Sequence, residues 1–162
     1  MLDPTFKNAK ILVVDDQQAN IDVIKALLDI DGYTDVKCTI DSRLVIELVK
    51  TFKPDLILLD LMMPNLSGFE VMELLKDHQK KSLNPDKYLP ILVLTADISS
   101  KTKQKALTSG AKDFLSKPFD LIEVRYRIKN LLETQYLIQK MESRKEFYEQ
   151  KVIEFLKMND EW

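Results

Sequence analysis

Short apolar runs alternate with amphipathic segments along most of the chain. The runs are nearly continuous in Val, Ile and Leu, which is typical of strands buried on both faces of a parallel sheet. The strands predicted in this way are Lys10–Asp15, Val36–Ile40, Leu56–Asp60, Ile91–Thr95 and Ala111–Ser116.

The segments between these strands have the spacing of helices with one apolar face. Gln18–Ile30 places Ile21, Ile24, Leu27 and Leu28 on one face, and Gly32 is a plausible stop. Further helices are predicted after a cap at Asp41 or Ser42, from Phe69, over Ser99–Ser109 and after Pro118. Five strand–helix units with short connections predict an α/β fold, a doubly wound parallel five-stranded sheet with right-handed crossovers.

The C-terminal segment departs from this alternation. From Phe119 to Met158 there is no Gly or Pro and charge is dense, so a continuous helix of roughly 60 Å is expected. Its first turns should cover the sheet with the apolar residues Leu121, Val124, Ile128, Leu131 and Leu132.

Beyond the sheet, such a helix would be marginally stable alone in water. Heptad lettering gives a mostly apolar seam, with Val124, Leu131, Ile138, Lys145 and Val152 at a and Arg127, Thr134, Met141, Tyr148 and Phe155 at d. We therefore predict a coiled coil that joins two copies into a homodimer. Two alternatives stay open: a helix folded back on its own domain, and a linker cut from a longer chain.

Composition narrows the class of partner. The 162 residues suffice for one domain with an appendage, and the net charge of −2 gives no reason to expect nucleic acid or a membrane as partner.

The single cysteine, Cys38, is expected to be a buried strand residue in a reducing compartment. No apolar stretch approaches the ~20 residues that span a bilayer, and the first ten residues do not resemble a signal peptide. A cytoplasmic location is expected.

Polar residues capable of chemistry follow four of the five predicted strands. They are Asp15 and Asp16, Asp60, Thr95 and Lys117. The carboxyl ends of parallel strands meet at one edge of the sheet, where ligands bind. Three acids, a hydroxyl and an ammonium group suit a divalent cation, Mg²⁺, together with a phosphoryl group. A carboxylate such as that of Asp60 can itself attack phosphorus and hold the group as an acyl phosphate.

Four motifs resemble the receiver domain of two-component response regulators. They are VVDD at 13–16, LILLDLMMPNLSGFE at 56–70, VLTA at 93–96 and FLSKPF at 114–119. The resemblance covers residues 8–132 and leaves 133–162 as a helical extension, either a coiled coil or a linker. It implies the flavodoxin-like (CheY-like) strand order 2-1-3-4-5, with the last helix extended.

The resemblance also implies roles for residues around the acceptor. Asp60 would take a phosphoryl group from a phosphohistidine of a histidine kinase or a phosphotransfer protein. Asp16, Asp60 and the main-chain carbonyl of Met62 would bind Mg²⁺, and Asp15 would act mainly through water.

A second group of residues would respond to the phosphoryl group. The Thr95 hydroxyl, the main-chain amide of Ala96 and the Lys117 ammonium would hold its oxygens. Thr95 and Phe114 would form the switch pair, and Pro118 matches the family's cis proline.

The expected function is a phosphorylation-dependent signalling switch that acts through the C-terminal helix, with no catalytic output domain in the chain. One alternative is the regulatory fragment of a larger enzyme, such as a cyclic-di-GMP phosphodiesterase, a cyclase or a hybrid kinase, because RYRIKNLLETQYL at 125–137 resembles linkers to such domains. An aspartyl-phosphate phosphatase is disfavoured, because such enzymes need an acid two residues after the nucleophile, where this chain has Met62.

Overall fold

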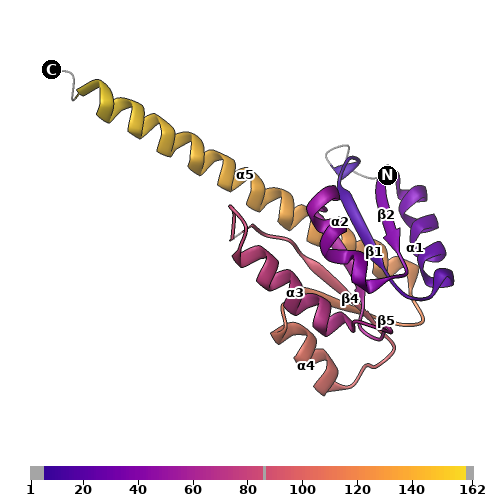
Figure 1. Ribbon diagram of the computed structural model, residues 1–162. Helices are drawn as coiled ribbons and strands as arrows, with labels where there is room; N and C mark the ends of the chain where they lie inside the picture. The colour runs from indigo at the N-terminus through magenta and orange to yellow at the C-terminus, as the bar shows by residue number, and fades with distance from the viewer. Residues whose placement is uncertain (1–5, 86, 160–162) are drawn as a thin grey trace.

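The computed structural model describes residues 6–85 and 87–159, which form a five-stranded parallel sheet with helices on both faces (Figure 1). The strand order β2-β1-β3-β4-β5 confirms the predicted doubly wound fold. The strands are β1 Lys10–Val14, β2 Asp35–Thr39, β3 Leu56–Asp60, β4 Ile91–Thr95 and β5 Asp113–Ser116. The helices are α1 Gln18–Asp31, the short 3₁₀ helix η2 Ser42–Leu44, α2 Val45–Phe52, α3 Gly68–Lys80, α4 Ser100–Thr108 and α5 Leu121–Asn159.

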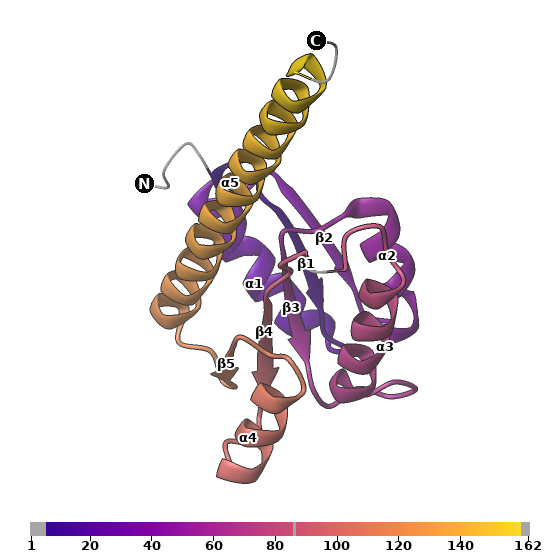
Figure 2. The same cartoon turned by 90° about the vertical axis from the view of Figure 1, so that its left-hand side faces the viewer.

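Two apolar cores lie on opposite faces of the sheet. Helices α1 and the first turns of α5 cover one face, and α2, α3 and α4 cover the other (Figure 2). The side chains of β1, β3 and β4 alternate between the two cores: Ile11 and Val13 belong to the first, Leu12 and Val14 to the second. These central strands are buried on both faces, which is why they contain almost no polar residue before their carboxyl ends.

Edge positions account for the differences from the predicted elements. Strand β2 lies at the edge of the sheet, so Cys38 is only half-buried rather than fully buried as expected. The final strand begins at Asp113, because Ala111 still belongs to the turn that follows α4.

Of the two caps predicted before the second helix, Asp41 is the one that the structure shows, and it caps η2. Its carboxylate accepts a hydrogen bond from the Arg43 backbone N–H at 3.0 Å.

Gly68 lets the start of α3 press against the end of β3. A Cβ at this position would lie 2.4 Å from the Asp60 carbonyl oxygen and 2.8 Å from the Leu61 Cα, and both are rigid backbone atoms. The Gly68 N–H also donates to the Leu61 carbonyl oxygen at 2.9 Å. The loop after Asp60 is therefore held by a contact that only glycine permits.

Gly68→Ala is expected to destabilise the fold by about 2–3 kcal/mol, because the added methyl group forces apart two backbone segments. Thermal unfolding should show a Tm roughly 5–10 °C lower. Ser100→Ala, an exposed change in the first turn of α4, is the control and should stay within about 0.5 kcal/mol of the parent. Equal Tm values for the two variants would contradict the close approach.

The first turns of α5 pack on the sheet, with one correction to the prediction. Val124, Ile128 and Leu132 are buried as expected, and Leu131 is partly buried. Leu121 is 45% exposed, so the expectation that it covers the sheet was wrong. It is the first residue of the helix and lies one turn before Val124, at the rim of the sheet.

The contact between α5 and the sheet extends past residue 132. Gln135 is 3% exposed, and its Nε2 donates to the Asp55 Oδ1 at 3.2 Å. The other carboxylate oxygen of Asp55 accepts from the Lys10 backbone N–H at 2.8 Å. Tyr136 adds an edge-to-face contact with Phe6, with ring centroids 5.8 Å apart. These contacts fix the direction in which α5 leaves the domain.

Beyond these contacts α5 projects away from the domain (Figures 1 and 2). The helix does not fold back on its own domain, so that alternative is wrong. Its projecting part exposes large apolar side chains, each more than half exposed: Met141, Phe147, Tyr148, Val152, Ile153, Phe155, Leu156 and Met158. Among the described residues no helix is both long and apolar enough to cross a membrane.

Candidate functional site

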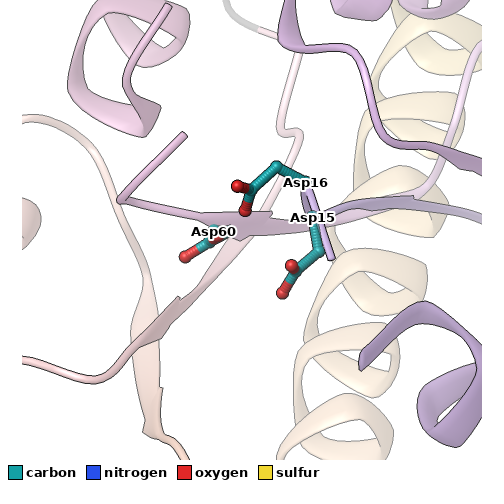
Figure 3. Close-up of side chains that lie close together, drawn as sticks. All are labelled: Asp15, Asp16 and Asp60. Carbon is teal, nitrogen blue, oxygen red and sulfur yellow. The ribbon is translucent and has the colours of Figure 1, made fainter. Parts of the chain in front are cut away.

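Three carboxylates gather at the carboxyl edge of the sheet. Asp15 and Asp16 follow β1, and Asp60 is the last residue of β3 (Figure 3). One carboxylate oxygen from each lies within 4.8 Å of the other two. Asp15 and Asp60 are buried and Asp16 is half-buried, so the cluster opens toward solvent on the Asp16 side. The strand pairing of β1 with β3 brings these residues together from positions far apart in the sequence.

Asp15 is held by several donors. Its Oδ1 accepts from the Gln17 backbone N–H at 2.9 Å, and both of its oxygens lie 3.2 Å from the Asn20 Nδ2. Asn20 belongs to the first turn of α1, and the sequence analysis did not identify it as a site residue. In the sequence, Asn20 is only an amide that follows the pair Asp15 and Asp16 by about one helical turn. That pattern is too common to identify a site residue by itself.

Lys117 supplies the positive charge of the site. Its Nζ lies 2.8 Å from the Asp15 Oδ2 and 3.2 Å from the Asp60 Oδ1. The Lys117 backbone N–H donates to the Thr95 carbonyl oxygen at 2.8 Å, which ties the end of β5 to the end of β4. The peptide bond between Lys117 and Pro118 is cis. The Lys117 ammonium group thus lies between two carboxylates. Together with Asp16, the site has three carboxylates and one ammonium group, and its net charge is negative.

The pKa of Asp60 is raised to about 6. Burial is the main cause, and the negative charge of Asp15 adds to it. Lys117 and the Met62 backbone N–H, which donates to the Asp60 Oδ1 at 3.3 Å, act in the opposite direction. Without a further cation, the ionised form of Asp60 is therefore less favourable in the folded protein than in water.

This raised pKa predicts a pH-dependent difference between the parent and Asp60→Asn in metal-free buffer. The unfolded pKa is about 3.9, so between pH 4 and 6 the folded state binds more protons and its stability falls as pH rises. Asn carries no charge and escapes this loss. The Tm of Asp60→Asn should exceed the parent's by roughly 2–5 °C at pH 8, and the difference should shrink at pH 5. Thermal unfolding with EDTA at both pH values measures it, and a variant less stable than the parent at pH 8 would contradict the origin of the shift.

Thr95 is buried at the end of β4, and its hydroxyl bonds to the following loop. The Oγ1 accepts from the Asp97 N–H at 3.0 Å and lies 3.2 Å from the Asp97 carbonyl oxygen, to which it donates. Ala96, between these two residues, is exposed. In this structure no hydrogen bond joins the Thr95 side chain to the described residues of the acidic cluster.

The two remaining predicted residues border the site. Phe114 is half-buried against the core that α3 and α4 cover, and the Lys103 Nζ lies 4.6 Å from its ring centroid. The Met62 side chain is 69% exposed, immediately after Asp60 and Leu61. All the predicted site residues therefore lie on the carboxyl ends of β1, β3, β4 and β5 or in the loops that follow them, except Phe114, which lies within β5.

Comparison with known families agrees with this geometry. The family model described as response regulator receiver domain matches residues 11–129. The chain belongs to the response regulator receiver family. The receiver domain includes the whole acidic cluster and Lys117, and the match ends within α5, before the projecting part of that helix.

Individual relatives of this receiver domain are longer proteins. The transcriptional regulatory protein YvrH of Bacillus subtilis is 37% identical over 131 residues, which are 81% of this chain and 52% of YvrH. The response regulator PleD of Caulobacter vibrioides is 34% identical over 137 residues, 85% of this chain and 29% of PleD. The chain thus spans about half or less of the length of these relatives. Among solved structures, the receiver domain of the Francisella response regulator 1452 is 30% identical, with a TM-score of 0.68, over 78% of this chain and 98% of that one.

Proposed function

We propose that this receiver domain is a phosphorylation-dependent switch in which Asp60 accepts the phosphoryl group. The observation that supports this most is the position of Asp60, at the end of a central strand, with an acidic cluster on one side and the Lys117 Nζ at 3.2 Å. The donor would be the phosphohistidine of a histidine kinase or of a phosphotransfer protein. A carboxylate oxygen of Asp60 attacks phosphorus, the P–N bond breaks, and the imidazole nitrogen keeps the electron pair and takes a proton.

The donor set of the acidic cluster fits Mg²⁺. Three carboxylate oxygens lie within 4.8 Å of one another, and Mg²⁺ prefers one or two carboxylates with water and phosphate oxygens as its remaining ligands. Asp16, Asp60 and the Met62 carbonyl would hold the ion directly, and Asp15, already paired with Lys117, would hold it through water. Bound there, the ion would neutralise charge on the phosphoryl oxygens.

Lys117 has a second role in this proposal. In this structure its ammonium group pairs with Asp15 and Asp60, and a phosphoryl oxygen on Asp60 would become its new partner. The Ala96 backbone N–H and the Thr95 hydroxyl would bind the other oxygens. For this, Thr95 must exchange its bonds to Asp97 for one to phosphate, which moves the loop between β4 and α4. Phe114, packed beside α4, would change its side-chain position in response to that movement.

We propose that the projecting part of α5 forms the output, a coiled coil between two copies. The exposed apolar side chains along it support the pairing, since a lone helix with such a surface is marginal in water. The seam can begin only after Thr134, because Val124 and Arg127 at earlier seam positions are used by the domain itself. Val124 is buried there, and Arg127 pairs with Asp113 at 2.6 Å.

Beryllofluoride, a mimic of the aspartyl phosphate, tests the switch. In the presence of Mg²⁺ it should raise the Tm of the parent by roughly 4–8 °C, because it binds the folded state alone. Neither beryllofluoride nor Mg²⁺ alone should produce this rise, and Asp60→Asn should show none. An equal rise in Asp60→Asn would mean that the ligand binds elsewhere and would refute the assignment of Asp60.

A further inference from the structure

A cavity of about 700 Å³ lies away from the Asp60 site. Its walls are the C-terminal end of α2, the part of α3 from Met72 to Gln79, described residues of the segment that links α3 to β4, and the turn after α4 that leads to Lys112. Ile91, the first residue of β4, is among its lining residues, so the cavity lies at the amino edge of the sheet. None of the proposed phosphorylation residues lines it.

The floor of this cavity consists of well-packed apolar side chains. Met72, Leu75 and Ile91 line it and are 1%, 6% and 7% exposed, so they belong to the core beneath α3. The Gln79 side-chain amide donates to the Lys87 carbonyl oxygen, which joins the end of α3 to a described residue of the linking segment. The volume lies within the range of about 300–1,000 Å³ that is usual for small-molecule sites.

The rim is strongly basic. Five of the lining residues are lysines, and among the described lining residues there is no Asp or Glu: Lys50, Lys53, Lys76, Lys87 and Lys112. Glu73 lies 3.5 Å from the Lys76 Nζ and compensates part of one charge from outside the lining. The full sequence carries a net charge of −2, so this concentration of lysines is local to the cavity. Such a basic recess attracts anions.

Tyr88 adds an aromatic wall to the same side. Its ring lies 5.4 Å from the Lys112 Nζ, and burial raises the pKa of its hydroxyl. The cavity thus combines an apolar floor, the Tyr88 ring and five lysines.

We propose that this cavity binds a small amphipathic anion. Its apolar body, preferably a ring, lies on Met72, Leu75 and Ile91, and its phosphate, sulfonate or carboxylate group pairs with the lysines of the rim. A simple inorganic anion would leave the apolar floor unfilled, and a neutral ligand would leave the lysines without a counter-charge. The proposed phosphorylation site takes no part in this binding.

The fluorescent aromatic sulfonate 8-anilinonaphthalene-1-sulfonate is a suitable probe. It should bind the full chain at one site with a Kd of about 10–100 μM. The double variant Lys50→Glu/Lys87→Glu should weaken binding at least about tenfold, and both lysines are exposed, so the fold should survive. The matched control Lys25→Glu/Lys101→Glu makes the same change of charge at exposed positions outside the cavity and should keep the parent's affinity.

The location of the probe is measured independently by NMR. The amide resonances of Leu75, Gln79 and Ile91 should shift on titration, and inorganic phosphate alone should displace the probe only weakly. Equal weakening in both double variants would show a general effect of charge and overturn the proposal. Shifts confined to residues 141–158 would place the probe on the projecting part of α5 and would also overturn it.

Discussion

Asp60→Asn is expected to abolish stable incorporation of phosphate from acetyl phosphate and Mg²⁺, to at least about 100-fold below the parent. The amide that replaces the carboxylate is a poor nucleophile and a poor ligand for Mg²⁺. Because Asn is nearly isosteric and the pKa of Asp60 is raised by burial and Asp15, the fold should not suffer. Intact-protein mass spectrometry of the two proteins after equal incubation measures the difference.

Asp29→Asn is the matched control for this experiment. Asp29 is exposed on α1, outside the acidic cluster, and the change removes the same charge from the chain. The control should label as the parent does. Label in Asp60→Asn at the parental level would move the acceptor to another residue and refute the proposed role of Asp60.

Val152→Glu is expected to convert the proposed dimer into a monomer and to raise its dissociation constant at least about 100-fold. In the seam that begins after Thr134, Val152 occupies an a position, where a buried carboxylate without a partner is strongly unfavourable. Val152 is 57% exposed in the single chain, so the receiver domain itself should keep its Tm. Sedimentation equilibrium over a range of protein concentrations measures the change.

Ile153→Glu is the matched control for Val152→Glu. It introduces the same charge one residue later, at a b position outside the seam, and Ile153 is similarly exposed at 52%. It should dimerise nearly as the parent does. If both variants dimerise alike, the seam has a different register. If the parent itself is a monomer at every concentration, the coiled coil is not the output.

Much of this site could be predicted because strand ends are the most regular feature of a doubly wound fold. Each apolar run ends where a parallel strand reaches the edge of the sheet, so Asp15, Asp60 and Thr95 could be placed at one edge from the sequence alone. Lys117 follows the last strand by the same logic, and its contacts with Asp15 and Asp60 agree with it.

Features that depend on side-chain direction could not be predicted in this way. The Asn20 amide reaches Asp15 because of the direction in which the first turn of α1 points its side chains. The Thr95 hydroxyl bonds to Asp97 rather than to the acidic cluster. Helical periodicity assigned Leu121 to the sheet, but the first residue of a helix at the rim has little sheet beneath it. Gln135 was missed for the opposite reason, because a polar residue in a charged helix gives no sign that the half-buried Asp55 lies beside it.

Chemical trapping of the aspartyl phosphate identifies directly the residue that accepts the phosphoryl group. The parent is treated with acetyl phosphate and Mg²⁺, reduced with borohydride, which converts an aspartyl phosphate into homoserine, and digested for tandem mass spectrometry. We expect homoserine at position 60 and unmodified Asp15, Asp16 and Asp97. Homoserine at one of those three positions, with aspartate intact at 60, would refute the proposed role of Asp60.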